Sequence, residues 1–317
     1  MAAQGTAYDV YGLTGNPYTV TPLTPLAIPP DARMPLGLDG FFDPRALDDY
    51  LEDVVADGRP AFVVVSGRDF TGRTSMARCV LDHYRRKRGL GDRFVVAEVN
   101  LNTFDAFELL SHALGRLRRG SVKMGVPLGT DLDRRLSQVS ESPRPGFLLR
   151  FQELAEDLET ALTAPDTPRH GFGVLIEGLM DVSMLGAAHE VFGDVPCVVV
   201  FTHQAGEHAK TAPLHGLTAD DAHLLHLHPL GSRQVRLLAE GRWAQATTEH
   251  PCPFDGPGLE SVFSTELPIK LVLKRLARLL QYRLNTAGRE AADAEKLKMS
   301  YAWLVETGRL LSEWNGR

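Results

Sequence analysis

Apolar residues follow two patterns along this chain, as short continuous runs and as stripes at helical spacing. The runs are rich in β-branched residues or leucine and have the length of buried strands. They are Ala61–Val65, Arg93–Asn100, Gly171–Gly178, Pro196–Thr202 and His223–Leu227. Stripes with spacings of three and four residues separate most of these runs. Strands that alternate with helices predict an α/β fold with a five-stranded parallel sheet.

After Pro229 only helical stripes follow. The predicted helices are Ser232–Trp243, Pro257–Ser264, Pro268–Leu284 and Ala291–Trp314. We therefore expect three parts in the chain. An extended N-terminal segment over residues 1–40 packs on the core, an α/β domain spans residues 41–230, and a small all-helical domain spans residues 231–317.

The helices of the α/β part have recognisable starts. Asp43 precedes Pro44, a residue favoured at the first helical position, and Thr103 can cap the helix that runs through Leu117. Residues 120–146 are rich in Gly, Pro and Ser with weak periodicity. This long insertion is a candidate functional loop, and the sequence does not decide whether it is ordered. Phe147–Leu162 is helical again.

A glycine loop follows the first predicted strand and precedes a helix. It reads Gly67-Arg-Asp-Phe-Thr-Gly-Arg-Thr-Ser75, which has the spacing of the phosphate-binding pattern G-x-x-x-x-G-K-[ST] with arginine in place of lysine. Its glycines let backbone N–H groups turn inward, and the helix N-terminus adds partial positive charge. The residues expected to contact a nucleotide here are Gly67, Thr71, Gly72, Arg73, Thr74 and Ser75. A glycine-rich turn without a ligand is the alternative.

Arg73 and Thr74 carry the chemistry of this loop. A guanidinium keeps the charge of lysine, but its planar fork binds phosphate bidentately rather than as a compact ammonium. The hydroxyl of Thr74 would bind Mg²⁺. Glu177 and Thr202 end two other strands, and the carboxyl ends of parallel strands form the ligand-binding edge of such a sheet. We expect them to converge with the loop.

Composition narrows the function classes. The net charge of −6 gives no global basic field for nucleic acid, and the three cysteines share no short spacing, which suits a reducing cytoplasm. No run of 18 apolar residues or secretory signal occurs, so we expect a cytoplasmic protein without a membrane span. The histidines between His203 and His228 lack the spacing of metal ligands, which favours structural roles. Abundant Arg, Ala and Gly fit a high-GC, bacterial genome.

The order of these parts resembles the AAA+ ATPases, above all their secretion-type and origin-recognition-type branch, over roughly residues 8–285. YGLTGNPY resembles the F-G-L-x-x-N-P-F segment that begins many of them. GRDFTGRTS resembles their Walker A motif, VLIEG their Walker B strand and VVVFTHQ their sensor-1 strand. HPLGSRQVRLLAEGRW resembles the segment that enters their helical lid.

This resemblance implies a sheet ordered 5-1-4-3-2, helices on both of its faces, and ATP or ADP with Mg²⁺ between sheet and lid. Lys270 lies near the sensor-2 position and would contact the nucleotide. Glu177 aligns with the Mg²⁺-organising acid, and Gly178 takes the place of the carboxylate that activates water. Shifting the alignment by one makes Glu177 the catalytic base and leaves no acid for the metal. Asp181 is a substitute acid or a helix cap.

One missing carboxylate predicts slow or absent hydrolysis. We therefore expect a nucleotide-binding switch or assembly component that works through a protein partner in trans, as a homo- or hetero-oligomer. A pseudo-ATPase scaffold without turnover is the alternative, and a P-loop kinase acting on a small molecule is a weaker one. Nucleic acid is not indicated as a partner.

Overall fold

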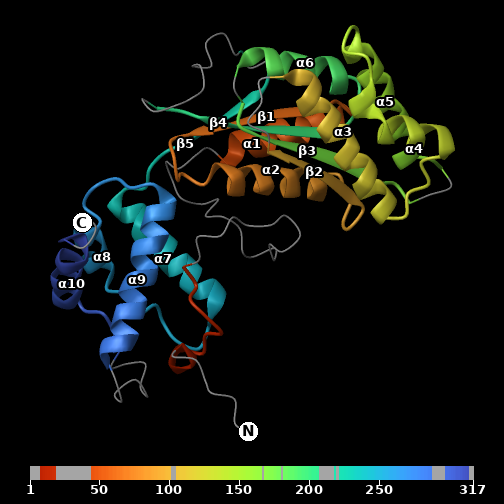
Figure 1. The fold of residues 1–317 in the computed structure, drawn as a ribbon. Helices are drawn as coiled ribbons and strands as arrows, with labels where there is room; N and C mark the ends of the chain where they lie inside the picture. The colour runs from red at the N-terminus through yellow and green to blue at the C-terminus, as the bar shows by residue number, and fades with distance from the viewer. Residues whose placement is uncertain are drawn as a thin grey trace.

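The computed structural model describes most residues of the chain. They are residues 8–18, 44–100, 105–165, 168–179, 181–206, 218, 221–287 and 297–313. Figure 1 shows a sheet flanked by helices, and beside it a group of helices from the C-terminal part of the chain. In the described residues, no helix combines the length and the apolar character that crossing a bilayer requires.

The sheet has five parallel strands. They are β1 (Ala61–Gly67), β2 (Phe94–Asn100), β3 (Gly171–Glu177), β4 (Val198–Gln204) and β5 (His223–Leu227). Their order is β2-β3-β4-β1-β5, and every adjacent pair is parallel. This confirms the predicted α/β class and the order 5-1-4-3-2. Every residue of β1 is buried, as expected for a central strand of a parallel sheet.

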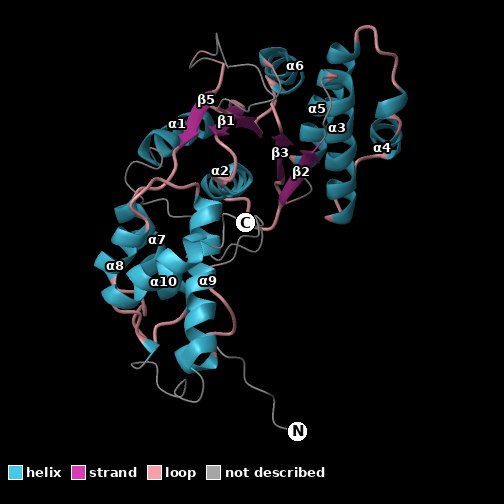
Figure 2. Cartoon of the chain, turned by 60° about the vertical axis from the view of Figure 1, so that its left-hand side comes forward, coloured by secondary structure: helices cyan, strands magenta, loops and turns pink. Residues whose placement is uncertain are grey.

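Two hydrophobic cores lie on the two faces of the sheet. Along β1, Val63 and Val65 belong to one core, whereas Phe62 and Val64 belong to the other, because successive side chains of a strand point to opposite faces. The first core is covered by α1 (Pro44–Ala56) and α2 (Arg73–Lys87), and the second by α3 (Ala106–Lys123), α5 (Phe147–Leu162) and α6 (Val182–Phe192). Figure 2 shows the two groups of helices on opposite sides of the strands.

The insertion at residues 120–146 is ordered and contains a helix, α4 (Thr130–Ser137), and a single helical turn, η3 (Val139–Glu141). Leu132, Leu136 and Val139 are buried against α3 and α5, which explains why the segment is fixed. Thr103 lies outside the described residues. The N-cap of α3 is Asp105, whose carboxylate accepts a hydrogen bond from the backbone N–H of Phe107 at 2.9 Å.

The helices after β5 are α7 (Ser232–Ala246), α8 (Gly256–Val262), α9 (Ile269–Ala287) and α10 (Tyr301–Glu313). Residues 8–18, which include the short turn η1 (Asp9–Tyr11), pack against them. The ring of Tyr11 meets Trp243 edge-on at 5.0 Å, and the Tyr18 hydroxyl donates to the carbonyl of Ala239 at 3.2 Å. Both tyrosines are buried.

The last helix, α10, begins at Tyr301 and not at Ala291, where the sequence predicts its start. Residues 291–296 lie outside the described residues, and α10 begins only at Tyr301. The backbone of Met299 bonds to Pro253 and Asp255 at 2.8 and 3.0 Å, so Met299 forms a β-bridge with Phe254 and is not part of a helix. Leu297 and Leu304 are buried, whereas Tyr301 at the start of α10 is 52% exposed.

Candidate functional site

The loop between β1 and α2 depends on glycine at both of its ends. A Cβ atom on Gly67 would lie 2.5 Å from Oγ1 of Thr71 and 3.2 Å from the carbonyl oxygen of Leu227, too close for any side chain. Gly72 is the N-cap of α2 and has φ 89°, in the left-handed region that favours glycine. The two glycines of the sequence pattern therefore shape the backbone of this loop.

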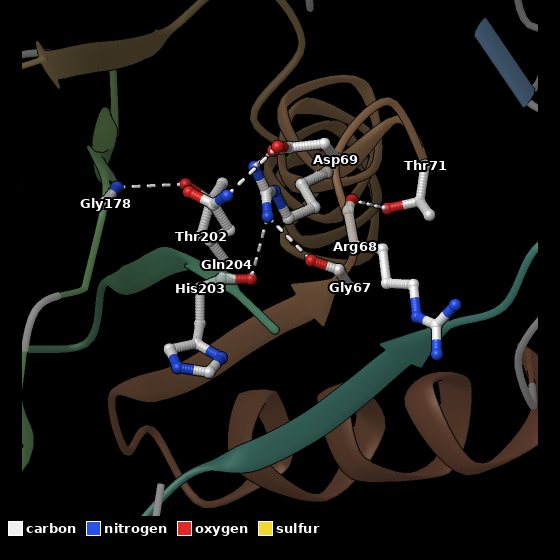
Figure 3. Close-up of polar contacts among 9 residues, drawn as sticks. Gly67, Arg68, Asp69, Thr71, Gly178, Thr202, His203 and Gln204 are labelled. Carbon is white, nitrogen blue, oxygen red and sulfur yellow. Dashed lines mark hydrogen bonds and ion pairs between the residues drawn. The ribbon is translucent and has the colours of Figure 1, made fainter. Parts of the chain in front are cut away.

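Short hydrogen bonds close the loop upon itself. The buried hydroxyl of Thr71 donates to the carbonyl of Arg68 at 2.8 Å, as Figure 3 shows. The carbonyl of Gly67 accepts from the backbone N–H of Ala205 at 2.9 Å, which ties the end of β1 to the residue after β4. Thr71, predicted to contact a nucleotide, thus fixes the shape of the loop through its side chain.

Arg73 spans the ends of two strands. Its Nη1 donates to the carbonyls of Gly67 at 2.6 Å and His203 at 3.4 Å, and its Nη2 lies 3.4 Å from Oδ1 of Asp69. Burial lowers the pKa of Arg73, and the nearby charges of Asp69 and Glu177 oppose this effect. The guanidinium is therefore inside the loop and within electrostatic reach of the predicted catalytic acid.

Asp69 places a negative charge on this loop, beside Arg73. Its Oδ2 accepts from Nε2 of Gln204 at 3.1 Å, so the end of β4 holds the carboxylate next to Arg73. Figure 3 shows the side chain of Arg68 directed away from Asp69 and Gln204. The loop thus contains one arginine that is partly neutralised by its own acid, and a second that points elsewhere.

Thr74 and Ser75 lie in the first turn of α2, and both are half-buried. The N–H groups of a helix's first turn have no acceptor within the helix and carry partial positive charge. This end of α2 therefore favours an anion. No metal-binding group of three or more His, Cys, Asp or Glu occurs among the residues whose placement is described. Thr74 and Glu177 offer Mg²⁺ few protein oxygens, a set that suits this ion only together with phosphate oxygens and water.

The end of β3 presents one acid. Glu177 is half-buried, and its Oε2 accepts from Nδ2 of Asn100 on β2 at 2.7 Å. The next residue, Gly178, has φ 90°, although nothing lies within 4 Å of where its Cβ would be. Backbone conformation and not lack of space therefore favours glycine where the resemblance expects a second carboxylate. Asp181 is a helix cap: its carboxylate accepts from the backbone N–H groups of Ser183 and Met184 at 2.8 and 3.2 Å.

Thr202 holds the turn after β3 in place. Its hydroxyl oxygen accepts from the backbone N–H of Gly178 at 3.0 Å, and its carbonyl accepts from Leu179 at 2.7 Å. Thr202 is 6% exposed. The predicted nucleotide contact is thus also a brace between β4 and β3, and Glu177 and Thr202 lie opposite each other in the strand register.

Lys270 lies at the start of α9 and contacts the loop. Its backbone N–H donates to the carbonyl of Phe70 at 3.0 Å, and its Nζ lies 5.1 Å from the centre of the Phe70 ring. Phe70 has φ 67°, unusual for a residue other than glycine, and its side chain is 51% exposed. The helical part of the chain is therefore bonded directly to the tip of the glycine loop.

Some residues of this region escaped the sequence prediction. Asn100 and Gln204 are polar residues at the ends of apolar strands, and the rule that selected Glu177 and Thr202 applies equally to them. The buried pair of Ser66 and His203, with Oγ and Nδ1 3.0 Å apart, has no such signal, because nothing local shows that β1 and β4 are neighbours. The rings of His226 and His228 lie close together, with their centres 4.7 Å apart.

Known structures share this fold. No protein-family model matches the sequence, and no curated protein matches it. Cdc6p from Pyrobaculum aerophilum aligns with 89% of this chain and 68% of its own, at a TM-score of 0.50 and 15% identity. The ORC2 protein of Aeropyrum pernix in its ADP form aligns with 89% of this chain and 70% of its own, at a TM-score of 0.50 and 16% identity. The chain has the fold of the AAA+ ATPases.

Proposed function

We propose that this protein binds ATP or ADP with Mg²⁺ at the glycine loop and acts as a switch or assembly component with slow or absent hydrolysis. One observation carries the proposal: the loop from Gly67 to Gly72 is closed at the N-terminus of α2 and bonded to the first turn of α9. A nucleotide held there would touch both the sheet and the C-terminal helices. The ADP form of the Aeropyrum pernix protein, which shares the fold, supports this assignment.

In this proposal each residue has a defined task. The N–H groups of the loop and of the first turn of α2 hold phosphate, and Arg73 supplies positive charge. Thr74 and Glu177 would hold Mg²⁺, which would neutralise phosphate charge when bound. Lys270 transmits the state of the site, because its N–H is bonded to Phe70 and any change in the loop's shape displaces the start of α9.

Slow or absent hydrolysis follows from the end of β3. Hydrolysis needs both a neutralised phosphate and a positioned water. Glu177 serves one of these tasks, while Gly178 has no side chain, and the carboxylate of Asp181 is engaged at the start of α6. A site of this kind holds its nucleotide and turns over little of it.

The output of such a switch would pass to a protein partner in trans, in a homo- or hetero-oligomer within the cytoplasm. The C-terminal helices offer a surface for it. Tyr301 and Val305 lie one turn apart on α10 and are 52% and 37% exposed. Exposed apolar residues at helical spacing are a surface that a partner can cover.

A scaffold without nucleotide turnover is the second candidate, and the contacts of Arg73 favour it. The guanidinium is bonded to the loop's own carbonyls and lies beside Asp69. These contacts keep the loop closed without a ligand. In a scaffold the loop would serve only to join β1, β4 and α9.

Calorimetric titration with ADP and ATP, with and without Mg²⁺, distinguishes the two candidates. The wild-type protein is expected to bind, and phosphate release in the same samples should be slow or undetectable. Arg73→Ala should weaken binding by about tenfold or more, because charged hydrogen bonds contribute roughly 1.5–3 kcal/mol. Arg68→Ala is the matched control, since its side chain is directed away from the site. Absence of binding by the folded wild-type protein would exclude the switch and leave the scaffold.

Asp69→Asn sharpens this test. The substitution removes the negative charge beside Arg73 while keeping the size of the side chain. If the loop binds phosphate, nucleotide affinity should rise about two- to fivefold, consistent with a partly exposed ion pair worth up to about 1 kcal/mol. Titration under the same conditions measures the change. An affinity unchanged or lowered by the substitution would contradict the assignment of Arg73 to phosphate.

A further inference from the structure

A polar cleft lies away from the glycine loop, between α3 and the ordered insertion. It has a volume of about 140 Å³. Residues of α3, of the end of α4 and of η3 line it, and none belongs to the loop, to β3 or to α9. Figure 1 shows α4 beside α3 and α5, on the side of the sheet opposite α2. The segment that the sequence marks as a candidate functional loop therefore forms one wall of a cleft.

Gly115 opens this cleft. It lies in the middle of α3, where glycine costs about 1 kcal/mol relative to alanine, so helix formation does not explain it. A Cβ atom there would lie 3.9 Å from Nη1 of Arg119 and 4.0 Å from Cγ1 of Val139. A larger side chain at this position would project between α3 and η3. Glycine thus keeps the space between the two walls open.

Basic side chains of α3 lie around Gly115. His112, Arg118 and Arg119 lie three or four residues from it, which places them around the same face of the helix. Arg118 is held by Asp133 of α4, with Nε and Nη2 at 2.8 and 2.9 Å from the carboxylate oxygens. The side chains of His112 and Arg119 make no hydrogen bond or ion pair with any residue that the structure describes. The lining includes no carboxylate.

The serines of the cleft complete its polarity. Ser137 at the end of α4 and Ser140 in η3 line the wall opposite α3. The Ser137 hydroxyl donates to the carbonyl of Arg134 at 2.7 Å, and Ser111 donates to Glu108 at 2.9 Å. Leu136 and Val139 are buried beneath them and keep this wall fixed. The cleft thus has a positively charged arginine without a described acidic partner on one side and a rigid wall on the other.

We propose that this cleft binds a small oxyanion, either a phosphate group or a carboxylate. Arginine offers a planar fork of donors that matches both groups, and Arg119 is the cation of the cleft whose charge no described acid offsets. The volume resembles that of a cavity that accommodates a benzene-sized molecule, so the ligand is a small molecule or a single side chain. The site is separate from the proposed nucleotide site, and its ligand is bound at the far face of the sheet.

NMR of the histidine rings tests the proposal. Inorganic phosphate and succinate are titrated separately at constant ionic strength, and the His112 signal is assigned by its loss in His112→Gln. Saturable movement of this signal with phosphate alone supports a phosphate ligand, and with succinate alone a carboxylate ligand. Saturation by neither probe overturns the proposal. Repeating the titration in Arg73→Ala separates this site from the glycine loop, because the His112 response should persist there.

Three variants locate the response. Arg119→Gln should weaken binding by about tenfold, since a charged hydrogen bond is lost on an exposed residue whose replacement leaves the fold intact. Gly115→Leu fills the cleft without changing its charge and should abolish saturation. Lys123→Gln removes one positive charge from the same helix outside the cleft and is the matched control. Equal weakening by Arg119→Gln and Lys123→Gln would show a diffuse charge effect and overturn the site.

Discussion

A glycine with positive φ follows each of two strands: Gly72 ends the loop after β1, and Gly178 comes directly after β3. The two glycines have opposite consequences for phosphate chemistry. Gly72 has φ 89° and Gly178 has φ 90°. At the first, the backbone turns into α2 and completes a loop suited to an anion. At the second, the backbone turns so that its N–H meets Thr202, and no carboxylate follows Glu177. A similar positive φ thus accompanies a loop suited to an anion at one strand end and the absence of a second carboxylate at the other.

The proposed phosphate loop and the turn after β3 are shaped by separate contacts. The loop after β1 owes its shape to contacts within the chain, such as that of Thr71 with Arg68, which need no acid at β3. The turn after β3 is fixed by Thr202 on β4. Gly178, which stands where the resemblance expects a second acid, is therefore part of a braced turn. Substitutions at the two ends should accordingly have different effects.

The largest effect is expected at the end of β1. Gly67→Ala places a Cβ atom 2.5 Å from Oγ1 of Thr71. Such overpacking costs roughly 1–3 kcal/mol, so the free energy of unfolding should fall by that amount. Urea denaturation followed by circular dichroism measures it. Gly15→Ala is the control, because nothing lies within 4 Å of its Cβ position.

A second substitution shows whether the clash is the cause. Gly67→Ala combined with Thr71→Ala removes the hydroxyl that the new methyl group meets. The double variant should lose less stability than the two single effects added together. Simple additivity would show that Thr71 does not determine the need for glycine at Gly67.

A smaller effect is expected at the end of β3. Gly178→Glu restores an acid next to Glu177 but forces a side chain into a left-handed conformation, which costs about 1–2 kcal/mol. Phosphate release should not increase, because the strain disturbs the turn that Thr202 holds. Unfolding curves and a phosphate assay check both statements. A stable variant with rapid phosphate release would contradict the claim that the backbone at Gly178 is unsuited to a second acid.

Two alanine variants, Gly178→Ala and Gly186→Ala, show whether Gly178→Glu destabilises the protein through backbone strain or through its added charge. Both sites have no atom within 4 Å of the added Cβ, but only Gly178 has a positive φ. Gly178→Ala should therefore destabilise the protein nearly as much as Gly178→Glu. Gly186→Ala lies in α6 and should stabilise it by up to about 1 kcal/mol. Similar stability of the two alanine variants would contradict the role of backbone conformation.

The sequence predicts what depends on local pattern. Buried runs such as β1 are recognisable because a parallel strand is apolar on both faces. His223–Leu227 and Phe147–Leu162 were predicted at their exact bounds. Glycine spacing located the loop, and strand ends located Glu177. Local physics is sufficient for these features.

Long-range contacts account for what the sequence did not predict. The late start of α10 follows from a bridge between Met299 and Phe254, which are far apart along the chain. The contact of Arg73 with the carbonyl of His203 requires β4 to lie beside β1. The conformation of Phe70 is fixed by the start of α9. None of these contacts can be recognised from the local sequence of the residues involved, so they are seen only in the folded structure.

The smallest effect concerns β5, the strand that flanks the end of β1. His226 lies opposite Ser66 in the register of the two strands. Partial burial lowers the pKa of His226 from 6.5, and the neighbouring His228 lowers it further. The unfolded chain therefore binds a proton more readily than the folded one, and stability should fall as the pH decreases from about 6.5 toward the lower folded pKa. Because the side chain is largely exposed, the loss should be only a few tenths of a kcal/mol.

Unfolding by urea at about pH 7.5 and about pH 5.5, in wild type and His226→Gln, measures this contribution. The variant should lose less stability than the wild type on acidification, because its glutamine does not titrate. An identical pH dependence in His226→Gln and wild type would show that protonation of His226 does not change the free energy of unfolding. The difference between the ends of β1 and β3 would then depend only on Gly72 and Gly178.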